Sequence, residues 1–426
     1  MANAARCDGR CNALHRHMQR AAFFRPFPCA TPDRVFRHRS HLPAASLPKG
    51  RGIWKKGAAE LHNGFNDLHN YPERTPLMGY YDEESPEVCD WEIKWASEHG
   101  INCFIHCWYR KKNNCGKTVT VKDLRCGHGL HEALFNARYQ KYMDFAIMFE
   151  ATNRWGATDS NDIIENLMPF WYDNYFSRNN YLKVDGKPVL FVYDTDDQIK
   201  NNFESAAEQK KAFDACRRFM EKKGYPGMIF ALNKRHAEKD ELEDIYARGY
   251  DFRFTYNYWR NGNGIVPSEE EVVEDQKCKL SEEFLIDSKR FIATASVFWD
   301  PTPRLSEAWV NKGYHYSDKN TWYLSPESFR KLLHDFKKMT DVLPKNAYGK
   351  KLMMIDNWNE WDEGHFVSPS HSHGFKYLQA IREELTQRNN LPDYRMPQDI
   401  CPSDLGKSWD VPDFTGVNRK DFYVTD

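Results

Sequence analysis

Short apolar runs recur along the chain and alternate with longer segments of helical periodicity. Each run has the length of a buried strand, and apolar side chains fill both faces of most runs. Such strands are typical of a parallel sheet that is covered on both sides. The predicted strands span residues 101–109, 144–149, 188–193, 227–232, 251–258, 291–299 and 352–357.

Helical patterns separate most of these strands. Segment 85–99 carries clear end signals, with Ser85 as the cap, Pro86 in the first position and Gly100 just past the end. Strands that alternate with helices indicate βαβ crossovers in a parallel sheet. The other predicted helices span residues 163–176, 204–223, 240–248, 327–339 and 374–385.

Seven such strands predict an α/β fold, a (β/α)8 TIM barrel in which the first strand is uncertain. That strand should lie before Gly79, but segments 35–42 and 52–54 are poor substitutes for it. Either a short irregular strand lies in this region or the first strand is missing, which would expose two sheet edges. The chain has no GxGxxG after its first strand and no GxxxxGK(S/T), so nucleotide-binding doubly wound folds lose support.

The first fifty residues differ from the rest of the chain. Their only acids are Asp8 and Asp33, against eight arginines and Lys49, and they contain no apolar core of a signal peptide. Such a segment fits a transit peptide, a disordered arm or a mis-assigned start, and a mis-assigned start would leave an extracytoplasmic location open. We therefore expect an unreliable or disordered segment at 1–60, a catalytic barrel at 61–395 and a C-terminal tail at 396–426.

The composition narrows the class of partner. The chain holds 60 Lys and Arg against 61 Asp and Glu, so no net field favours nucleic acid or an anionic membrane. No stretch approaches the roughly 20 apolar residues of a membrane span. The 11 cysteines show no paired CxxC and predict no disulfide framework. An aromatic content of 15% fits a large aromatic core or a carbohydrate-binding cleft, and composition alone favours the core.

Polar and aromatic residues gather where the predicted strands end, which is where barrel enzymes carry their working groups. A single polar residue at a strand end often only meets water, but seven ends of one carbohydrate-like character favour a binding site. The candidates are His106, Trp108, Tyr109, Glu150, Asn153, Arg154, Trp155, Asp194, Asn233, Tyr256, Tyr258, Trp299, Asp300, Arg304 and residues 357–363.

The last strand runs directly into two glutamates, Glu360 and Glu363, set among Trp358, Asn359 and Trp361. Paired carboxyl groups suit the cleavage of a glycosidic bond, because one protonates the leaving oxygen while the other acts on the opposite side of the sugar. The indole rings offer apolar faces for a pyranose. For Trp358, packing within the barrel is an equally good interpretation.

Four segments of the chain form a specific combination: GYYDEESPEVCDWEIKWASEHGINCFIHCWY (79–109), YLKVDGKPVLFVYD (181–194), FWDPTPR (298–304) and IDNWNEWDEG (355–364). These segments resemble the WbsX-like proteins, which belong with glycoside hydrolase family 99, the endo-α-mannosidase and endomannanase family. The likeness runs from about residue 79 to 386, and the loop segments 110–140 and 260–290 lie outside it.

The resemblance implies a (β/α)8 barrel that acts as a retaining glycosidase through neighbouring-group participation, with no metal and no cofactor. Glu363 resembles the general acid/base, which protonates the leaving oxygen and then activates water. Glu360 resembles the carboxylate that deprotonates the sugar's own 2-hydroxyl, so that this oxygen attacks C1 and forms a 1,2-anhydro intermediate. This chemistry requires two carboxyl groups with separated pKa values.

The resemblance also implies contacts with a polysaccharide or glycan substrate. Glu150 resembles an acid that contacts the bound sugar, Tyr256 or Tyr258 resembles the tyrosine of the cleaved subsite, and Trp108 is a candidate stacking platform. A structural role is about as good an interpretation for these residues. The predicted substrate-binding residues are His106, Trp108, Glu150, Tyr256, Tyr258, Trp299, Asp300, Trp358, Asn359 and Trp361.

The chain departs from the family pattern in two respects. The family's first strand with its aromatic residues is not recognisable in this sequence, and WbsX-like proteins differ from the endomannosidases in their sugar-binding loops. The reaction class therefore transfers better than the mannose specificity. Asp300 and Arg304 are also able to pair with each other and merely brace the site.

Two weaker signals point elsewhere. Asp194 and Asp196 form a DxD, which holds a divalent metal in nucleotide-sugar glycosyltransferases but arises easily by chance. His365, His371 and His373 follow the glutamates without a recognisable ligand spacing, so we expect a solvated loop there and not a metal site.

The sequence is therefore compatible with three functions. The leading hypothesis is a metal-independent glycoside hydrolase of a complex polysaccharide or glycan. A glycosyltransferase of polysaccharide assembly would instead require a metal and bind a nucleotide sugar. An inactive glycan-binding barrel would bind sugar regardless of Glu360 and Glu363. The sugar, its linkage, endo or exo action and the oligomeric state are left open.

Overall fold

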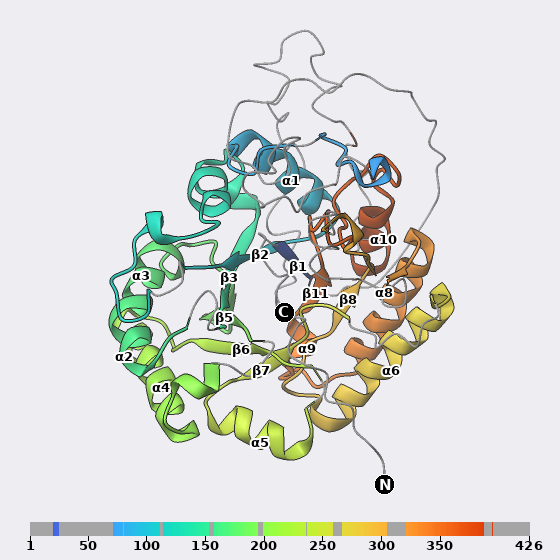
Figure 1. The fold of residues 1–426 in the computed structure, drawn as a ribbon. Helices are drawn as coiled ribbons and strands as arrows, with labels where there is room; N and C mark the ends of the chain where they lie inside the picture. Colours follow the sequence, from blue (N-terminus) through green and yellow to red (C-terminus); the bar gives the residue numbers. More distant parts are fainter. Residues whose placement is uncertain are drawn as a thin grey trace, which may run out of the picture.

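The computed structural model describes residues 20–24, 71–79, 81–110, 114–152, 157–194, 199–235, 237–258, 266–304, 321–386 and 394. Its strands form a ring at the centre of the molecule, and helices surround this ring (Figure 1). The main strands are β1 (Arg20–Phe24), β2 (Cys103–Trp108), β3 (Asp144–Glu150), β5 (Lys187–Tyr193), β6 (Ile229–Asn233), β7 (Phe252–Phe254), β8 (Thr294–Ser296) and β11 (Met353–Asp356).

The ring of strands is closed. The strand order is β7-β6-β5-β3-β2-β1-β11-β8, and the pairs β2–β3, β3–β5, β5–β6, β6–β7 and β11–β8 are parallel. A parallel bridge between Arg253 in β7 and Phe291, just before β8, joins the two ends of this order. Its hydrogen bonds run from Arg253 N to Arg290 O at 2.7 Å and from Ile292 N to Arg253 O at 3.1 Å. The prediction of a (β/α)8 barrel is confirmed.

Strand β1 occupies the place for which no strand was predicted. It runs antiparallel to both neighbours, with Ala22 opposite Phe104 of β2 on one side and Ile355 of β11 on the other. Because all strands of an ordinary (β/α)8 barrel are parallel, this strand departs from the pattern. It pairs the two edges that would otherwise be open. Strand β1 lies within residues 1–60, which were predicted to be separate from the barrel at 61–395. The boundary at residue 60 stays a prediction.

The helices lie outside the strands (Figure 1). The predicted helix at 85–99 is confirmed, since Ser85 Oγ accepts a hydrogen bond from Val88 N and Pro86 begins the helix. The helices are α1 (Pro86–Glu98), α2 (Ser160–Asp162), α3 (Met168–Trp171), α4 (Ala206–Lys222), α5 (Lys239–Ala247), α6 (Glu269–Asp287), α8 (Pro326–Asp341), α9 (Tyr348–Lys351) and α10 (Lys376–Leu385).

Several shorter elements complete the chain. The predicted helix at 163–176 is interrupted by π-helical turns at Ile163–Leu167 and Tyr172–Phe176. A further π turn covers Gly129–Ala133. The short strands are β4 (Lys183–Val184), β9 (Phe298–Trp299) and β10 (Trp322–Tyr323). Single 3-10 turns cover Pro72–Arg74, Val121–Asp123, Leu134–Asn136, Gln140–Tyr142, Ile199–Asn202 and Thr302–Arg304.

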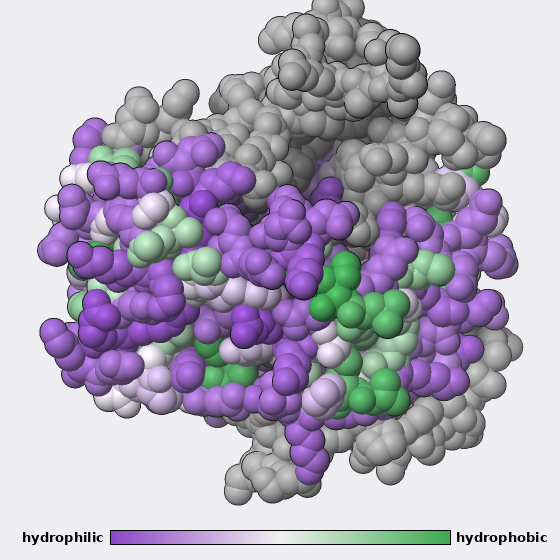
Figure 2. All heavy atoms as spheres, turned by 90° about the horizontal axis from the view of Figure 1, so that it is seen from below, coloured by the Kyte–Doolittle hydropathy of each residue, from purple (hydrophilic) through white to green (hydrophobic). Residues whose placement is uncertain are grey.

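Much of the aromatic content serves the core. Trp108 packs against Phe149 and Trp171, with ring centroids 5.7 and 5.5 Å apart. Burying such rings is among the largest stabilising contributions to a fold. The face in Figure 2 is mostly hydrophilic, with hydrophobic side chains gathered in a limited area. None of the described helices is long and apolar enough to cross a bilayer.

Candidate active site

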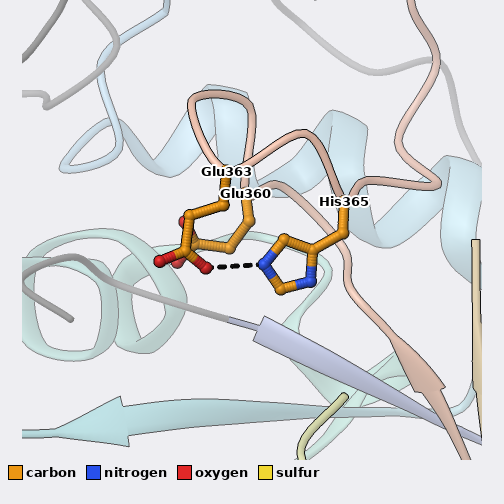
Figure 3. A group of neighbouring side chains, drawn as sticks. All are labelled: Glu360, Glu363 and His365. Carbon is orange, nitrogen blue, oxygen red and sulfur yellow. Dashed lines mark hydrogen bonds and ion pairs between the residues drawn. The ribbon is translucent and has the colours of Figure 1, made fainter. Parts of the chain in front are cut away.

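The turn that follows β11 carries both predicted catalytic glutamates. Figure 3 shows Glu360, Glu363 and His365 converging from this single turn. One side-chain oxygen or nitrogen of each residue lies within 4.8 Å of those of the other two. All three side chains are fully buried. The structure therefore brings Glu360 and Glu363 together at the carboxyl end of the barrel strands and adds a histidine to them.

His365 lies between two carboxylates. Its Nε2 is 2.6 Å from Glu363 Oε2, and its Nδ1 is 2.6 Å from Asp356 Oδ1. Burial opposes a charge on the ring, but Asp356 and Glu363 outweigh this effect and raise the pKa of His365 to about 10. At neutral pH the ring is thus an imidazolium that donates to both carboxylates. The expected solvated loop was wrong for His365, whereas His371 is exposed and His373 is half-buried.

A buried chain of hydrogen bonds holds Asp356 in place. Ser296 Oγ donates to Asp356 Oδ2 at 2.6 Å, and Tyr258 N donates to Ser296 Oγ at 2.8 Å. Gln276 of α6 exchanges two 3.1 Å hydrogen bonds with the backbone of Ser296. The chain therefore extends from helix α6 through β8 and β11 to His365. Asp356, Ser296 and Gln276 were not among the predicted site residues, because only the tertiary contacts reveal their connection.

The backbone of the glutamate turn is fixed from the loop after β9. Asp300 N donates to Glu363 O at 2.9 Å. Arg74 in turn donates to Asp300 O at 2.6 Å and forms an ion pair with the Asp300 carboxylate. Asp300 thus braces the turn, which is the alternative weighed for it beside substrate binding, but its partner is Arg74. The side chain of Arg304, the predicted partner, lies outside the described part of the chain.

Tyr256 faces the two glutamates. Asn357 Nδ2 donates to its hydroxyl at 2.6 Å, and Tyr256 N donates to Asn233 Oδ1 at 2.8 Å. Burial, followed by the charges of Glu360 and Glu363, raises the pKa of Tyr256 well above its ordinary value. The phenol therefore remains neutral beside the two glutamates.

Tyr258 points away from this group. Its hydroxyl donates to Asp275 on α6, and its ring lies 5.1 Å from that of Trp322, centroid to centroid. Of the two tyrosines that the sequence offered for the cleaved subsite, only Tyr256 lies beside the glutamates.

The side chains of β2 divide between its two faces. The pKa of Cys107 is raised by burial and then by the charges of Glu360 and Glu150, so this thiol faces the carboxylates. Alternation along a strand turns His106 and Trp108 to the opposite face. There Trp108 Nε1 donates to the hydroxyl of Tyr175 in the helical layer at 3.0 Å. The structure gives neither His106 nor Trp108 a place beside the glutamates.

Glu150 and Trp299 belong to the glutamate side of the barrel. Glu150 ends β3, accepts a 3.2 Å hydrogen bond from Thr152 N and helps to raise the pKa of Tyr193. The ring of Trp299 lies 5.1 Å from the imidazole of His365, centroid to centroid. Both were predicted as substrate contacts, and that role stays a prediction. Residues 153–156 lie outside the described ranges.

The residues between the glutamates anchor the turn. Trp358 Nε1 donates to Glu92 of α1 at 3.0 Å. Trp361 Nε1 donates to the Tyr81 hydroxyl at 3.1 Å, and Asn359 Nδ2 donates to the same oxygen at 3.3 Å. All three side chains are buried. Their contacts fix the turn against the segment around α1, which is the packing role weighed for Trp358.

The DxD signal falls on another face of the barrel. Asp194 is buried, and its Oδ2 accepts a 2.9 Å hydrogen bond from Ile199 N. Its neighbour Tyr193 packs on Tyr256 on the glutamate side. Asp196 lies outside the described residues. Asp194 instead lines a cavity of about 280 Å³ together with Lys200, Gln209, Lys234, Asp244, Arg248 and Tyr250.

Glu360, Glu363 and His365 form a donor set that a transition metal would accept. In this arrangement, however, Asp356 and Glu363 occupy both ring nitrogens. A protonated imidazole has no lone pair for a metal, so these contacts favour a proton at this position.

Comparisons with known proteins identify a matching family and two related sequences. The sequence model of the family described as "Glycosyltransferase WbsX" matches residues 54–381. The uncharacterized protein WxcX of Xanthomonas campestris pv. campestris is 22% identical over 398 residues, both in strain B100 and in strain ATCC 33913. The match covers 83% of this chain and 49% of each relative. The chain thus spans about half the length of these curated relatives.

Two solved structures are similar, both of the GH99 endo-alpha-mannosidase from Bacteroides thetaiotaomicron. The complex with BIS-TRIS-Propane has a TM-score of 0.46 and 15% identity, and covers 72% of this chain and 85% of that chain. The other has a TM-score of 0.44 and 17% identity, and covers 73% of this chain and 81% of that chain.

Proposed function

The chain belongs to the WbsX glycosyltransferase family, and on this premise we propose that it is a retaining glycoside hydrolase acting on a complex polysaccharide or glycan. The observation that carries the proposal is the pairing of Glu360 and Glu363, whose nearest oxygens lie within 4.8 Å of each other. Retaining glycosidases hold their carboxyl groups about 5–5.5 Å apart, while inverting enzymes need about 6.5–9.5 Å to admit a water. Nearest oxygens within 4.8 Å fit the closer of these spacings, and in the proposal the sugar's own 2-hydroxyl takes the place of the carboxylate nucleophile.

In the proposed mechanism the two glutamates act on opposite sides of the sugar. Glu363 gives a proton to the leaving oxygen as the bond to C1 breaks. Glu360 takes the proton of the 2-hydroxyl, whose oxygen attacks C1. Glu363 then removes a proton from the water that opens the 1,2-anhydro ring, and Glu360 returns its proton to O2, so that the sugar regains its 2-hydroxyl and Glu360 is ionised again. Tyr256, whose hydroxyl accepts a hydrogen bond from Asn357, is the proposed tyrosine of the cleaved subsite.

Glu360 and Glu363 are fully buried in the structure. A site from which water is excluded strengthens the electrostatic interactions on which the proposed mechanism depends.

The family description names a transferase, and that activity makes different demands. A transferase built on Asp194 and Asp196 would bind a divalent metal and a nucleotide sugar. Asp194 lies against the cavity beside α4 and α5, on the other side of the sheet from Tyr193 and the glutamates. This position favours the hydrolase. An inactive glycan-binding barrel would keep its sugar affinity without Glu360 and Glu363.

The deciding experiment is product release from a panel of α-linked polysaccharides in the presence of EDTA. We expect wild-type protein to release sugar, and Glu363→Gln and Glu360→Gln to lose about two or more powers of ten in rate. Glu274→Gln on the exposed side of α6 is the matched control and should keep full activity. Circular dichroism of each variant checks the fold.

Near wild-type rates for Glu363→Gln would contradict the assignment of Glu363 as the general acid/base. A folded wild type that releases nothing would shift support to the other two hypotheses. Binding of a nucleotide sugar with Mn²⁺ would then identify the transferase, and sugar binding alone the inactive barrel.

A further inference from the structure

His365 carries the inference that goes furthest beyond this proposal, and it rests on the proposed function. We infer that His365 is a positioning residue for Glu363. Held from behind by Asp356, it fixes the Glu363 carboxyl group in one orientation and stores the proton that this group passes to the leaving oxygen.

The geometry leaves the ring little freedom. Its Nε2 and Nδ1 each contact a carboxylate oxygen at 2.6 Å, and the ring is fully buried. Asp356 cannot turn away, because its second oxygen accepts the 2.6 Å hydrogen bond from Ser296 Oγ. The backbone of Glu363 is held at the same time by Asp300 N. Glu363 is thus restrained both at its backbone carbonyl and at its side-chain Oε2.

The charges around the ring require that it carry a proton. Asp356 faces it from β11, Glu363 and Glu360 face it from its own turn, and Tyr256 faces it with a ring centroid 5.9 Å away. Trp299 covers another side and is uncharged. Buried carboxylates without a counter-charge would be strongly destabilising. Arg235, just after β6, also interacts with Asp356, but the imidazolium is the cation that the described structure places in direct contact with both Glu363 and Asp356.

The stored proton follows a closed cycle. It moves from His365 Nε2 to the Glu363 carboxylate, which leaves a neutral imidazole and makes Glu363 the acid. Glu363 gives the proton to the glycosidic oxygen as the bond from C1 to that oxygen breaks. In the second step Glu363 removes a proton from water, and this proton returns to Nε2. Each turnover therefore ends with His365 charged again.

The test compares His365→Gln and Asp356→Asn with the exposed control His371→Gln. Each is assayed on the polysaccharide that wild type cleaves and on the α-glycosyl fluoride of the released sugar, whose leaving group needs no proton. We expect both variants to lose about tenfold or more on the polysaccharide and about twofold or less on the fluoride. The basic limb of the pH–rate profile should move to lower pH in His365→Gln. Equal losses on both substrates would mean a merely structural role and overturn the inference.

A second measurement needs no substrate. In protein labelled with ¹⁵N-histidine, the His365 resonances should report two N–H groups from pH 7 to beyond pH 8 in wild type, and a ring that deprotonates at lower pH in Asp356→Asn. A neutral ring at pH 7 would overturn the inference even if the hydrolase is correct. Stoichiometric zinc or manganese in the purified protein, lost in His365→Gln, would overturn it in favour of a metal site. If wild type cleaves no glycan although His365 is charged, the proposed function is wrong. The ion pairs of His365 with Glu363 and Asp356 would still be supported.

Discussion

The N–H of Asp300 donates a 2.9 Å hydrogen bond to the carbonyl oxygen of Glu363. This bond joins the loop after β9 to the turn that carries the predicted acid. Gly364 lies beneath the contact with φ at 70°, and a Cβ there would lie 2.8 Å from Asp300 O and 2.9 Å from Arg74 Nη1. The position of Glu363 therefore depends on a residue without a side chain.

Gly364→Ala should consequently both destabilise the protein and disable the site. The left-handed backbone alone costs an alanine about 1–2 kcal/mol, and the contact with Asp300 must add to this by displacing one of the two loops. We expect a lower urea midpoint and a tenfold or greater loss of activity, from displacement of Glu363 by about 1 Å.

Gly116→Ala supplies the matched control for this variant. Gly116 has a similar φ of 74°, but nothing lies within 4 Å of its added Cβ. It should therefore lose only the backbone part of the stability and keep its activity. If the two variants behave alike, the contact between Asp300 and the Glu363–Gly364 turn is unimportant.

The charge on His365 predicts how stability depends on pH. Its pKa of about 10 in the folded protein exceeds the ordinary 6.5. The stabilisation is fully present below pH 6.5 and is lost as the pH rises through about 10. We expect the urea midpoint of wild type to fall between pH 7 and pH 10 by more than that of His365→Gln. Tyrosines and lysines titrate in both proteins, so the difference isolates His365, and parallel curves would contradict the assignment.

A second buried charge pair stabilises the fold away from the site. Arg253 of β7 lies 2.7 Å from Glu283 of α6, and both side chains are almost fully buried. Removing one partner leaves the other charge buried without compensation, which typically costs about 3–5 kcal/mol. Glu283→Gln should therefore lower the urea midpoint strongly. Glu274→Gln, at an exposed position on the same helix, should leave it unchanged, and similar midpoints for the two variants would show that the pair contributes little.

The barrel could be predicted because its strands are nearly continuous apolar runs, a pattern that is visible within each segment alone. Helix α6 was missed because the burial of its polar residues depends on partners elsewhere in the chain. Its buried face includes Gln276 and Glu283, whose partners Ser296 and Arg253 are distant in sequence. The capping box of Ser268 and Glu271, with hydrogen bonds of 2.8 and 3.3 Å, was the local signal available.

The candidate site was predictable in part. Glu360 and Glu363 stood out because two carboxyl groups follow an apolar strand. His365 did not, because a histidine in a Ser- and Pro-rich stretch is usually exposed to solvent. Its hydrogen bonds with Asp356 and Glu363 are visible only in the folded structure. His106 was assigned to the site although strand alternation sets it opposite Cys107. Strand β1 escaped notice because five residues carry too little pattern to predict a strand.

The spacing of Glu360 and Glu363 makes the stereochemistry of the products a direct test of the mechanism. Nearest oxygens within 4.8 Å fit the close carboxyl pairing of retaining enzymes better than the wider separation of inverting enzymes. A sugar released from an α-linked substrate should therefore appear first as the α-anomer, which proton NMR in the first minutes of reaction would detect before mutarotation. Added methanol should be captured as the methyl α-glycoside, since the 1,2-anhydro ring can be opened by any small nucleophile that Glu363 deprotonates. The β-anomer as first product would require a wider separation of the carboxyl groups during catalysis and would rule out participation of the 2-hydroxyl, whatever the rates of the glutamate variants.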